Sequence, residues 1–364
     1  MISGAQKQQF IEQGYLVAKG LLDVEVDIKP FRRAYTEFLD SLAAIFIAKA
    51  NPALAADYGA LPFAERVAIL FGCSGGSVLD HLDPTLVILK PDYQRQKDLP
   101  TAQRPELFRL MRSDRLLDGL EALLGPEIAA SSVYHINLKL GERLRGLARR
   151  AARSAHQRLP ARSPIWGFAA GAATVWHTDA AYMLADASDS QIINAWIPIT
   201  EATIENGCLL IVPGSHRARF GRDNVPEALT PNAIALPASP GDVVFMDAHL
   251  LHASLDNRTS GEVRWAVNFR FHPTGKAPGR PYLPGFIARS RENPERELRD
   301  PKLWGEMWQA AIDFLSEHPH AAHDGEGLGL KEAEAITARW TAATRDYRDW
   351  LHLKEADLSQ TAGG

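Results

Sequence analysis

Two histidines and one aspartate in this sequence have the types and spacing of a metal-binding set. His177 and Asp179 stand two residues apart in Trp-His-Thr-Asp, so on an extended strand both side chains point to the same face. Because His-x-Asp also occurs by chance in proteins that bind no metal, the pair needs a third donor. His252 follows in an apolar segment. Two imidazoles and one carboxylate on one face of a metal form the ligand set of non-haem Fe(II) enzymes, which leaves coordination positions open.

The segment that supplies the third donor contains two histidines, and strand parity distinguishes them. Ser254 stands two residues after His252, so it points to the same side and is placed to hydrogen-bond a bound cosubstrate. His249 is an odd number of residues from His252 and faces away if the strand is regular. A structural role is the simpler interpretation of His249. We therefore expect His252 to be the third ligand.

An arginine twelve residues after His252 has the chemistry to hold a carboxylate. In the predicted strand 263–271 the apolar residues alternate with a face that carries Arg264, and the neighbours on that face are small or polar. A guanidinium group binds a carboxylate in bidentate geometry, as in the distal carboxylate of 2-oxoglutarate. The simpler alternative is a surface salt bridge. Of the two arginines on this face, Arg270 fits that alternative better.

The elements that position these side chains follow from the hydrophobic periodicity. Up to about residue 125 apolar residues recur at three- and four-residue intervals, and from Ser132 the period changes to two. The helices predicted in the first part are 8–15, 28–48 and 107–124. The predicted strands are 133–138, 174–178, 192–199, 208–212, 233–236, 242–247, 250–255 and 263–271. Beyond Pro284 the pattern returns to helix, with 303–315 and 332–353 as the candidates.

Eight short strands separated by turn signals predict a sandwich or barrel, of which a jelly roll is one natural closure. The fold class is therefore α+β with a mainly β core. A mostly helical part, 1–130, precedes the jelly-roll core 131–275, and a helical part, 285–364, follows it. We interpret 1–364 as a single catalytic domain, because jelly-roll enzymes with added helices reach this length.

The composition excludes several classes of partner. The chain has 364 residues, 46% of them hydrophobic, and a formal net charge of -4, which gives no reason to expect nucleic acid or an anionic membrane as partner. No apolar run reaches the length that spans a bilayer, and the polar start lacks the core of a signal peptide. Two cysteines, Cys73 and Cys208, are too few for a disulfide framework or a thiolate zinc site and favour the reducing cytoplasm.

A basic insertion, 140–170, precedes the strand of His177. It contains seven arginines and Glu142 as its only acid. The arginines are Arg143, Arg145, Arg149, Arg150, Arg153, Arg158 and Arg162. The insertion is either a solvated surface loop or helix, or a site that recruits an acidic substrate. Residues 142–153 are compatible with a helix, and we expect the insertion at the rim of the substrate mouth.

The order of these motifs resembles the phytanoyl-CoA dioxygenase family of Fe(II)- and 2-oxoglutarate-dependent oxygenases. The resemblance begins at 9–17, which looks like the family's opening helix and strand. It continues through Trp-His-Thr-Asp at 176–179, Asn-Ala-Trp-Ile-Pro at 194–198, Glu-Asn-Gly-Cys-Leu at 205–209, Pro-Gly-Ser-His at 213–216, His-Ala-Ser at 252–254 with Asn257, and Arg-Trp at 264–265. The long basic insertion departs from the family pattern, and nothing in the sequence specifically supports a CoA thioester as substrate.

The resemblance implies a cupin-like double-stranded β-helix, or jelly roll, whose mouth holds Fe(II). It makes His177, Asp179 and His252 the iron ligands and Arg264 the anchor for the far carboxylate of 2-oxoglutarate. The positions that resemble further contacts with this cosubstrate are Asn137, Lys139, Trp196 and Ser254. His216, in the Pro-Gly-Ser-His turn, is interpreted as structural.

The implied activity is that of a dioxygenase that uses Fe(II), 2-oxoglutarate and O₂ to hydroxylate an unactivated C–H bond of a small molecule, anionic if the arginines recruit it, with release of succinate and CO₂. Halogenating relatives lack the carboxylate ligand, so Asp179 favours hydroxylation, whereas desaturation and cyclisation also use the complete triad. Two other interpretations are a non-catalytic jelly-roll binding protein and a cupin-type metalloenzyme without an oxo-acid cosubstrate. Arg264 counts against both.

Overall fold

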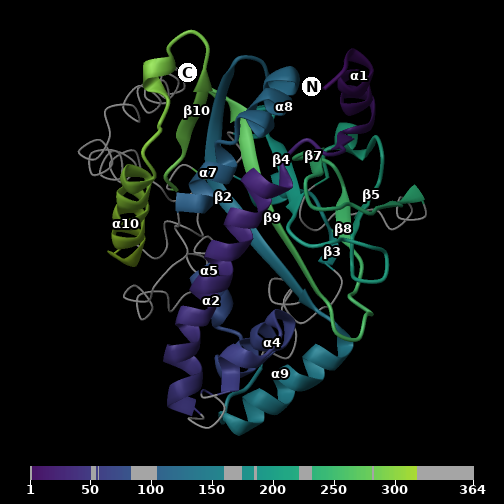
Figure 1. Ribbon diagram of the computed structural model, residues 1–364. Helices are drawn as coiled ribbons and strands as arrows, with labels where there is room; N and C mark the ends of the chain where they lie inside the picture. The colour runs from purple at the N-terminus through teal and green to yellow at the C-terminus, as the bar shows by residue number, and fades with distance from the viewer. Residues whose placement is uncertain are drawn as a thin grey trace.

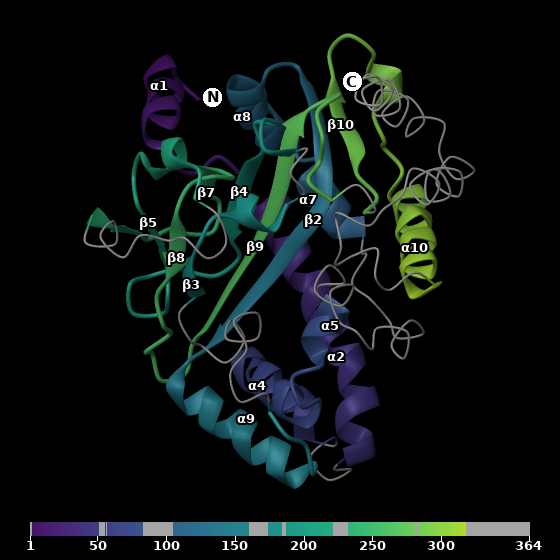
Figure 2. The same ribbon diagram turned by 180° about the vertical axis from the view of Figure 1, so that it is seen from behind.

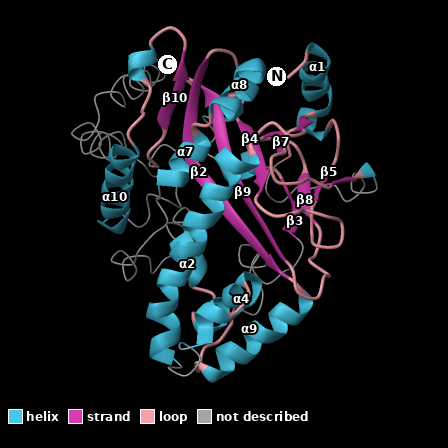
Figure 3. Ribbon diagram, viewed as in Figure 1, coloured by secondary structure: helices cyan, strands magenta, loops and turns pink. Residues whose placement is uncertain are grey.

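In the computed structural model, the described part of the chain contains two antiparallel β-sheets and helices that cover one side of them (Figure 1, Figure 3). The structure describes residues 2–50, 55, 57–82, 105–159, 174–183, 187–220, 232–280 and 283–317. The larger sheet has six strands in the order β1-β7-β4-β9-β2-β10, and the smaller has four in the order β3-β8-β5-β6. Since neighbours in the sheets are far apart in the sequence, residues from many segments meet between them.

Each of the predicted strands has a counterpart in the structure. The strands are β1 Tyr15–Ala18, β2 Glu127–Leu140, β3 Thr174–His177, β4 Ile193–Pro198, β5 Leu209–Ile211, β6 Ile234–Leu236, β7 Val243–Asp247, β8 His252–Ser254, β9 Val263–Pro273 and β10 Phe286–Ser290. The prediction of helix beyond Pro284 is wrong for β10, which pairs with β2. Five residues are too few to establish a period, and the pairing with β2 decides their conformation.

The helices follow the predictions except in the region before β2. They are α1 Gly4–Gln13, α2 Lys29–Ala50, α4 Phe63–Cys73, α5 Val78–Leu82, α7 Pro105–Met111, α8 Asp114–Leu124, α9 Glu142–Ser154 and α10 Pro301–Glu317. The predicted helix 107–124 is two helices, because Ser113 has a non-helical ψ of 126°, and α4 was not predicted. The predicted helix 332–353 lies outside the described residues. In the described part of the chain, none of the helices combines the length and hydropathy needed to cross a bilayer.

One face of β9 packs against the helices. Trp265 of this strand lies 5.9 Å from the ring centroid of Phe31 in α2 and 5.6 Å from that of Phe63 in α4. The apolar residues of the same face of β9 belong to one core with α2, α4, α7 and α8. Figure 1 shows α2 in front of β9 and β2, and Figure 2 shows the opposite side of the sheet. Burial of this apolar face is the main force that holds the helices on the sheet.

The other face of β9 is also buried, although it is polar. Arg264, Asn268 and Arg270 lie on this face and are at most 8% exposed. They face the smaller sheet, because Arg270 contacts Asp179 just beyond β3 and Lys139, opposite Arg264, contacts Ser254 of β8. Buried polar groups are stable only with partners or ligands, so the space between the sheets is where a functional site is expected.

The basic insertion is ordered as helix α9 from Glu142 to Ser154. It packs closely on α4, where a Cβ added to Gly72 would lie 2.2 Å from the Ala148 carbonyl oxygen. Figure 1 shows α9 beside α4 at the end of the large sheet. The helix-compatible stretch predicted in the insertion is confirmed, and its apolar face is structural.

Two arginines of α9 also have structural partners. Arg143 pairs with Glu65 of α4 at 2.9 Å. Arg145 donates to the carbonyl oxygens of Leu140 and Asn257 at 3.0 and 2.8 Å. Arg149, Arg150, Arg153 and Arg158, on or just after the helix, are also exposed, and Arg162 lies outside the described residues. Part of the basic character of the insertion therefore serves to attach the helix.

Candidate metal centre and carboxylate site

The three predicted metal ligands come from two paired strands and the turn that follows one of them. His177 ends β3 and is paired with His252 at the start of β8. Asp179 opens the short 3-10 turn Asp179–Tyr182. Sheet pairing stops at His177, but Thr178 keeps an extended backbone with φ -115° and ψ 143°, so side-chain alternation continues as far as Asp179. The argument from parity is correct although the strand ends earlier than predicted.

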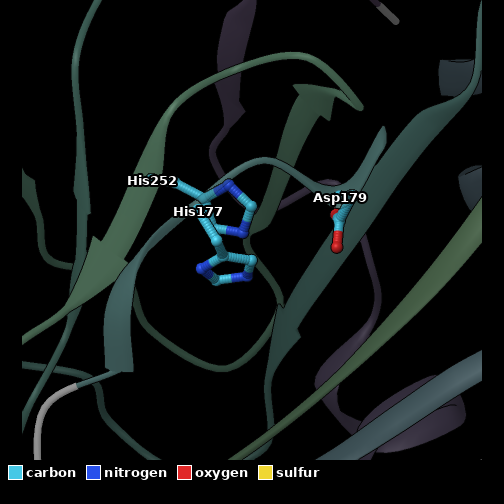
Figure 4. Close-up of side chains that lie close together, drawn as sticks. All are labelled: His177, Asp179 and His252. Atoms are coloured by element: carbon cyan, nitrogen blue, oxygen red, sulfur yellow. The ribbon is translucent and has the colours of Figure 1, made fainter. Parts of the chain in front are cut away.

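The three side chains converge. One donor atom of each residue lies within 4.8 Å of the other two, and Figure 4 shows the carboxylate facing the two imidazole rings across a gap. The ring centroids of His177 and His252 are 4.2 Å apart. The Nδ1 of His252 lies 2.9 Å from the Leu250 carbonyl oxygen, so Nδ1 can donate this hydrogen bond and leave Nε2 for a metal. Two imidazole nitrogens and a carboxylate oxygen fit a divalent iron.

His249 is not part of this group. It lies in the turn between β7 and β8, and its Nδ1 is 3.3 Å from the Asp247 carboxylate, which also accepts from the His249 backbone N–H at 2.8 Å. The structure thus places His252, which strand parity favours, with His177 and Asp179, and places His249 in a local contact with Asp247.

The carboxylate of Asp179 is held by two donors from the large sheet. Arg270 Nη2 lies 2.5 Å from Oδ1, and Asn194 Nδ2 lies 2.6 Å from Oδ2. Burial raises the pKa of Asp179, but the charges of Arg270 and the two histidines, with the hydrogen bond from Asn194, outweigh burial and hold this pKa below its usual range. The carboxylate is therefore ionised and ready to bind a cation.

The interpretation of Arg270 as a surface ion pair is wrong. Arg270 is 5% exposed and pairs with a buried carboxylate. The reason is topological: β9 is an interior strand of the large sheet, with helices on one face and the smaller sheet on the other. Strand parity already put Arg270 on the face of Arg264, and it put Asn194 on the face of Trp196, so the sequence contained a signal for both residues.

Two buried basic side chains lie side by side at the other end of this face. Lys139 of β2 is paired with Arg264 of β9, and they are 0% and 2% exposed. Lys139 Nζ donates to Ser254 Oγ at 2.8 Å and to the Leu255 carbonyl oxygen at 2.5 Å. Arg264 lies over the ring of Trp196 at 5.8 Å, and its Nε and Nη1 have no hydrogen-bond partner in the described structure.

Burial of these two basic groups lowers the pKa of each. Burial, together with the charge of Arg264, lowers the pKa of Lys139 to about 6, and burial lowers the pKa of Arg264 to about 10. The charge of Asp256 partly opposes the fall in the pKa of Lys139, whereas Arg264 has no carboxylate partner within the described ranges. Unpaired buried cations are costly, so the arrangement suits an anionic ligand that supplies the missing charge.

The other predicted cosubstrate contacts lie near this pair. Ser254 Oγ accepts from Lys139 and lies 2.5 Å from Thr174 Oγ1, Trp196 stacks under Arg264, and Asn137 Nδ2 lies 3.5 Å from Asn268 Oδ1. Sequence reasoning did not single out Thr174, which fixes the Ser254 hydroxyl. These residues are brought together in the fold, whereas their roles remain predictions.

Comparison with known families identifies the segment that carries the site. The family model described as phytanoyl-CoA dioxygenase (PhyH) matches residues 93–266, a range that contains the predicted metal ligands, Lys139 and Arg264. A phytanoyl-CoA dioxygenase domain-containing protein 1 homolog of Caenorhabditis elegans is 43% identical over 47 residues, which are 13% of this chain and 16% of that protein. The chain thus matches only about a sixth of the length of this curated relative. The match supports, over residues 93–266, the family resemblance that the motifs predicted.

Comparison with solved structures identifies the fold. The non-heme monooxygenase ThoJ in its apo form is 16% identical, with 92% of this chain and 99% of that chain covered and a TM-score of 0.50. EctD from S. alaskensis, solved with 2-oxoglutarate and 5-hydroxyectoine, is 20% identical over 76% of this chain and 77% of that chain, with a TM-score of 0.47. The prediction of a jelly-roll core flanked by helices is confirmed.

Proposed function

We propose that this protein, whose residues 93–266 match the phytanoyl-CoA dioxygenase family model, is an Fe(II)- and 2-oxoglutarate-dependent oxygenase of a small molecule. The observation that carries the proposal is the combination of two groups on the facing sides of the sheets. One is the convergent set of two imidazoles and a carboxylate, and the other is the buried Arg264, which has no acid partner in the described structure and lies beside Lys139. Neither group alone specifies the reaction, but together they provide for a metal and for a dicarboxylate.

His177, Asp179 and His252 are the proposed iron ligands. His252 would bind through Nε2, because Nδ1 lies within hydrogen-bond distance of the Leu250 carbonyl oxygen. Iron bound there would supply the activation of O₂ that oxidises 2-oxoglutarate to succinate and CO₂ and then the substrate. Three protein ligands leave room for a chelating cosubstrate and for O₂.

Arg264 and Lys139 are the proposed anchor for the far carboxylate of 2-oxoglutarate. The guanidinium has two nitrogens, Nε and Nη1, without a partner in the described structure, so it has donors free for a carboxylate. Lys139 contacts Ser254, which follows His252 by two residues on β8, or about 6–7 Å along a strand. A five-carbon dicarboxylate has a comparable length, so one molecule can reach from the metal ligands to the two cations.

The remaining predicted contacts orient the cosubstrate and keep water away. Trp196 is 3% exposed and lies against Arg264, which shields the ion pair that a carboxylate would form and so strengthens it. Ser254, fixed by Thr174, holds the ammonium group of Lys139 at the same place. Asn137 is proposed as a further polar contact on the same face of β2.

Hydroxylation of an unactivated C–H bond is the proposed outcome. Asp179 occupies the coordination position that a halide takes in halogenating relatives, so the complete triad favours transfer of oxygen. Desaturation and cyclisation use the same triad and are the alternatives within this class. The exposed Arg149, Arg150 and Arg153 of α9 support a substrate that carries a carboxylate or phosphate.

Formation of succinate tests the proposal directly. The protein is supplied with Fe(II), 2-oxoglutarate and O₂, and a panel of metabolites is screened for those that increase the conversion of 2-oxoglutarate to succinate. We expect substrate-dependent succinate from the wild-type protein and none from His177→Ala. His249→Ala is the matched control and retains most of the activity. A wild-type protein that binds neither a divalent metal nor 2-oxoglutarate in a calorimetric titration overturns the proposal.

A further inference from the structure

Both carboxylate oxygens of Asp179 are occupied by donors from the opposite sheet. Oδ1 accepts from Arg270 Nη2 at 2.5 Å and Oδ2 from Asn194 Nδ2 at 2.6 Å. Arg270 and Asn194 lie directly opposite each other on the paired strands β9 and β4. Asp179 follows the smaller sheet, so the large sheet presents one cross-strand pair of donors to a side chain that comes from the other layer.

The contact of Asp179 with Arg270 and Asn194 is buried, and the two donor side chains each keep an atom without another partner. Asp179, Arg270 and Asn194 are 4%, 5% and 1% exposed. Nε of Arg270 and Oδ1 of Asn194 have no hydrogen-bond partner in the described structure, and Asp179 is the only acid with which Arg270 forms an ion pair there. Buried polar groups are usually satisfied in full, so two donors that each leave an atom unsatisfied indicate that the contact with Asp179 determines their placement.

The geometry limits how the carboxylate can bind a metal. Each carboxylate oxygen has two lone pairs, and here each oxygen gives one of them to a donor. To chelate a metal symmetrically through both oxygens, the carboxylate would have to rotate or shift away from at least one donor. Binding through one oxygen keeps both hydrogen bonds, so the two donors favour a single-oxygen contact.

We propose that Arg270 and Asn194 are positioning residues that hold Asp179 as a single-oxygen metal ligand and thereby keep the coordination positions for the cosubstrate and O₂ open. The inference rests on the proposed function, because it takes Asp179 to be a metal ligand. The charge of Arg270 should also favour binding of the cosubstrate. Its charge offsets that of Asp179, so a divalent metal at the site keeps more of its attraction for a dianionic cosubstrate.

Two titrations on each variant separate this role from a merely structural one. Mn(II) is titrated calorimetrically into the metal-free protein, and 2-oxoglutarate is then titrated into the Mn(II)-loaded protein. In Arg270→Met, 2-oxoglutarate affinity should fall by about tenfold or more, an effect comparable with the loss of activity when partners of metal ligands are removed. Mn(II) affinity should change by a smaller factor, since the three ligands remain.

The visible absorption of the Co(II)-loaded protein reports the coordination directly. We expect Arg270→Met to change the intensity of this spectrum before 2-oxoglutarate is added, as a second carboxylate oxygen enters the coordination sphere. Asn194→Leu removes only the other donor and should give the same change to a smaller extent. Arg270→Lys keeps the charge and should recover part of the 2-oxoglutarate affinity.

Arg289→Met is the matched control. Arg289 is a buried arginine of β10 that pairs with acids of α8, away from the metal ligands, so its loss should leave both affinities and the Co(II) spectrum unchanged. If Arg270→Met does not fold, Asn194→Leu provides the same tests.

The inference is overturned if the variants bind 2-oxoglutarate and Co(II) as the wild type does, or if Mn(II) and 2-oxoglutarate affinities fall by equal factors. A wild type that binds no Mn(II) contradicts the proposed function instead.

Discussion

Arg264 and Arg270 lie on the same face of β9, six residues apart, and both are buried, yet their surroundings differ in one respect. Arg270 has a carboxylate partner within the protein, Asp179, at 2.5 Å. Arg264 has none in the described structure and lies beside the amine of Lys139. A buried cation that is paired within the protein is already neutralised by its partner. An unpaired buried cation is costly, so it favours a ligand that supplies the opposite charge.

The same strand therefore serves the two ends of one proposed ligand. The Arg270 end supports the carboxylate that binds the metal, and the Arg264 end accepts the carboxylate of the cosubstrate. The difference between the ends lies in the source of the negative charge, which the protein supplies at the Arg270 end and the cosubstrate would supply at the Arg264 end.

Loss of the metal ligands is the largest expected effect, because it removes the site that both ends serve. His177→Ala, Asp179→Ala and His252→Ala should each abolish tight Fe(II) binding and the formation of succinate. His249→Ala should keep most of the activity, since His249 contacts Asp247 rather than the ligand group. Metal content after dialysis and succinate yield measure these effects. An inactive His249→Ala beside a fully active His252→Ala would contradict the assignment of the third ligand.

Removing Arg264 tests the end that lacks an internal acid. Truncating one partner of a buried ion pair costs roughly 3–5 kcal/mol, so Arg264→Ala should raise the Michaelis constant for 2-oxoglutarate by orders of magnitude. Fe(II) affinity should stay close to that of the wild type, because Arg264 lies at the far end of the face. Steady-state kinetics with varied 2-oxoglutarate measure the change, and an unchanged constant excludes the anchor role.

Replacing Arg270 and replacing Arg264 should have different effects on the free energy of unfolding of the metal-free protein. Arg270→Met leaves the carboxylate of Asp179 buried without its partner and should lower the free energy of unfolding by about 3–5 kcal/mol. Arg264→Met removes an unpaired buried cation and should leave that free energy unchanged or raise it. Urea denaturation of both variants, metal-free and without 2-oxoglutarate, measures the contrast. Equal losses in the two variants would mean that Arg264 has a partner of its own in solution.

The protonation of Lys139 should make cosubstrate binding depend on pH. Burial and Arg264 lower the pKa of Lys139 to about 6, so in the ligand-free protein the amine is mostly neutral above that pH. A bound carboxylate favours the ammonium form, and binding above the pKa therefore takes up a proton. The affinity for 2-oxoglutarate should fall as pH rises from about 6 to 8, by at most about tenfold per pH unit.

Lys139→Met provides the comparison for this pH effect. The variant should bind 2-oxoglutarate more weakly than the wild type at about pH 6, with a flatter dependence on pH above it. Calorimetry in buffers of different ionisation enthalpy counts the protons taken up. Identical pH profiles for the two proteins would show that Lys139 does not contact the cosubstrate.

Local patterns in the sequence predicted the parts of the site that depend on strand parity. The pairing of His177 with Asp179, the choice of His252 over His249 and the inward direction of Arg264 all follow from alternation along single strands. The ion pair of Arg270 with Asp179 did not follow, because it depends on which strands lie in the interior of the large sheet. Alternation alone cannot distinguish a polar face toward solvent from a polar face toward a second sheet.

The elements outside the jelly roll show the same limit. The helix 142–154 was visible in its periodicity, but its packing on α4 was not, since α4 itself was not predicted. The strand β10 is too short to have a readable period and forms because β2 offers an edge to pair with. Tertiary partners decided both cases, and no pattern within either segment contains that information.

Three exposed arginines extend the comparison to charges that are neither buried nor paired inside the protein. Arg149, Arg150 and Arg153 lie on the solvent side of α9, where charges are screened over about 8 Å in physiological salt. If they recruit an anionic substrate, they act on its encounter and orientation, so the expected effect is the smallest of this series.

The triple replacement by serine should raise the Michaelis constant for the substrate a few-fold, in the range of about 1 kcal/mol for exposed charges, without changing affinity for iron or 2-oxoglutarate. Added salt should reduce the wild-type activity more than that of the triple variant. Equal responses to salt and equal substrate constants would show that these arginines only solvate the helix.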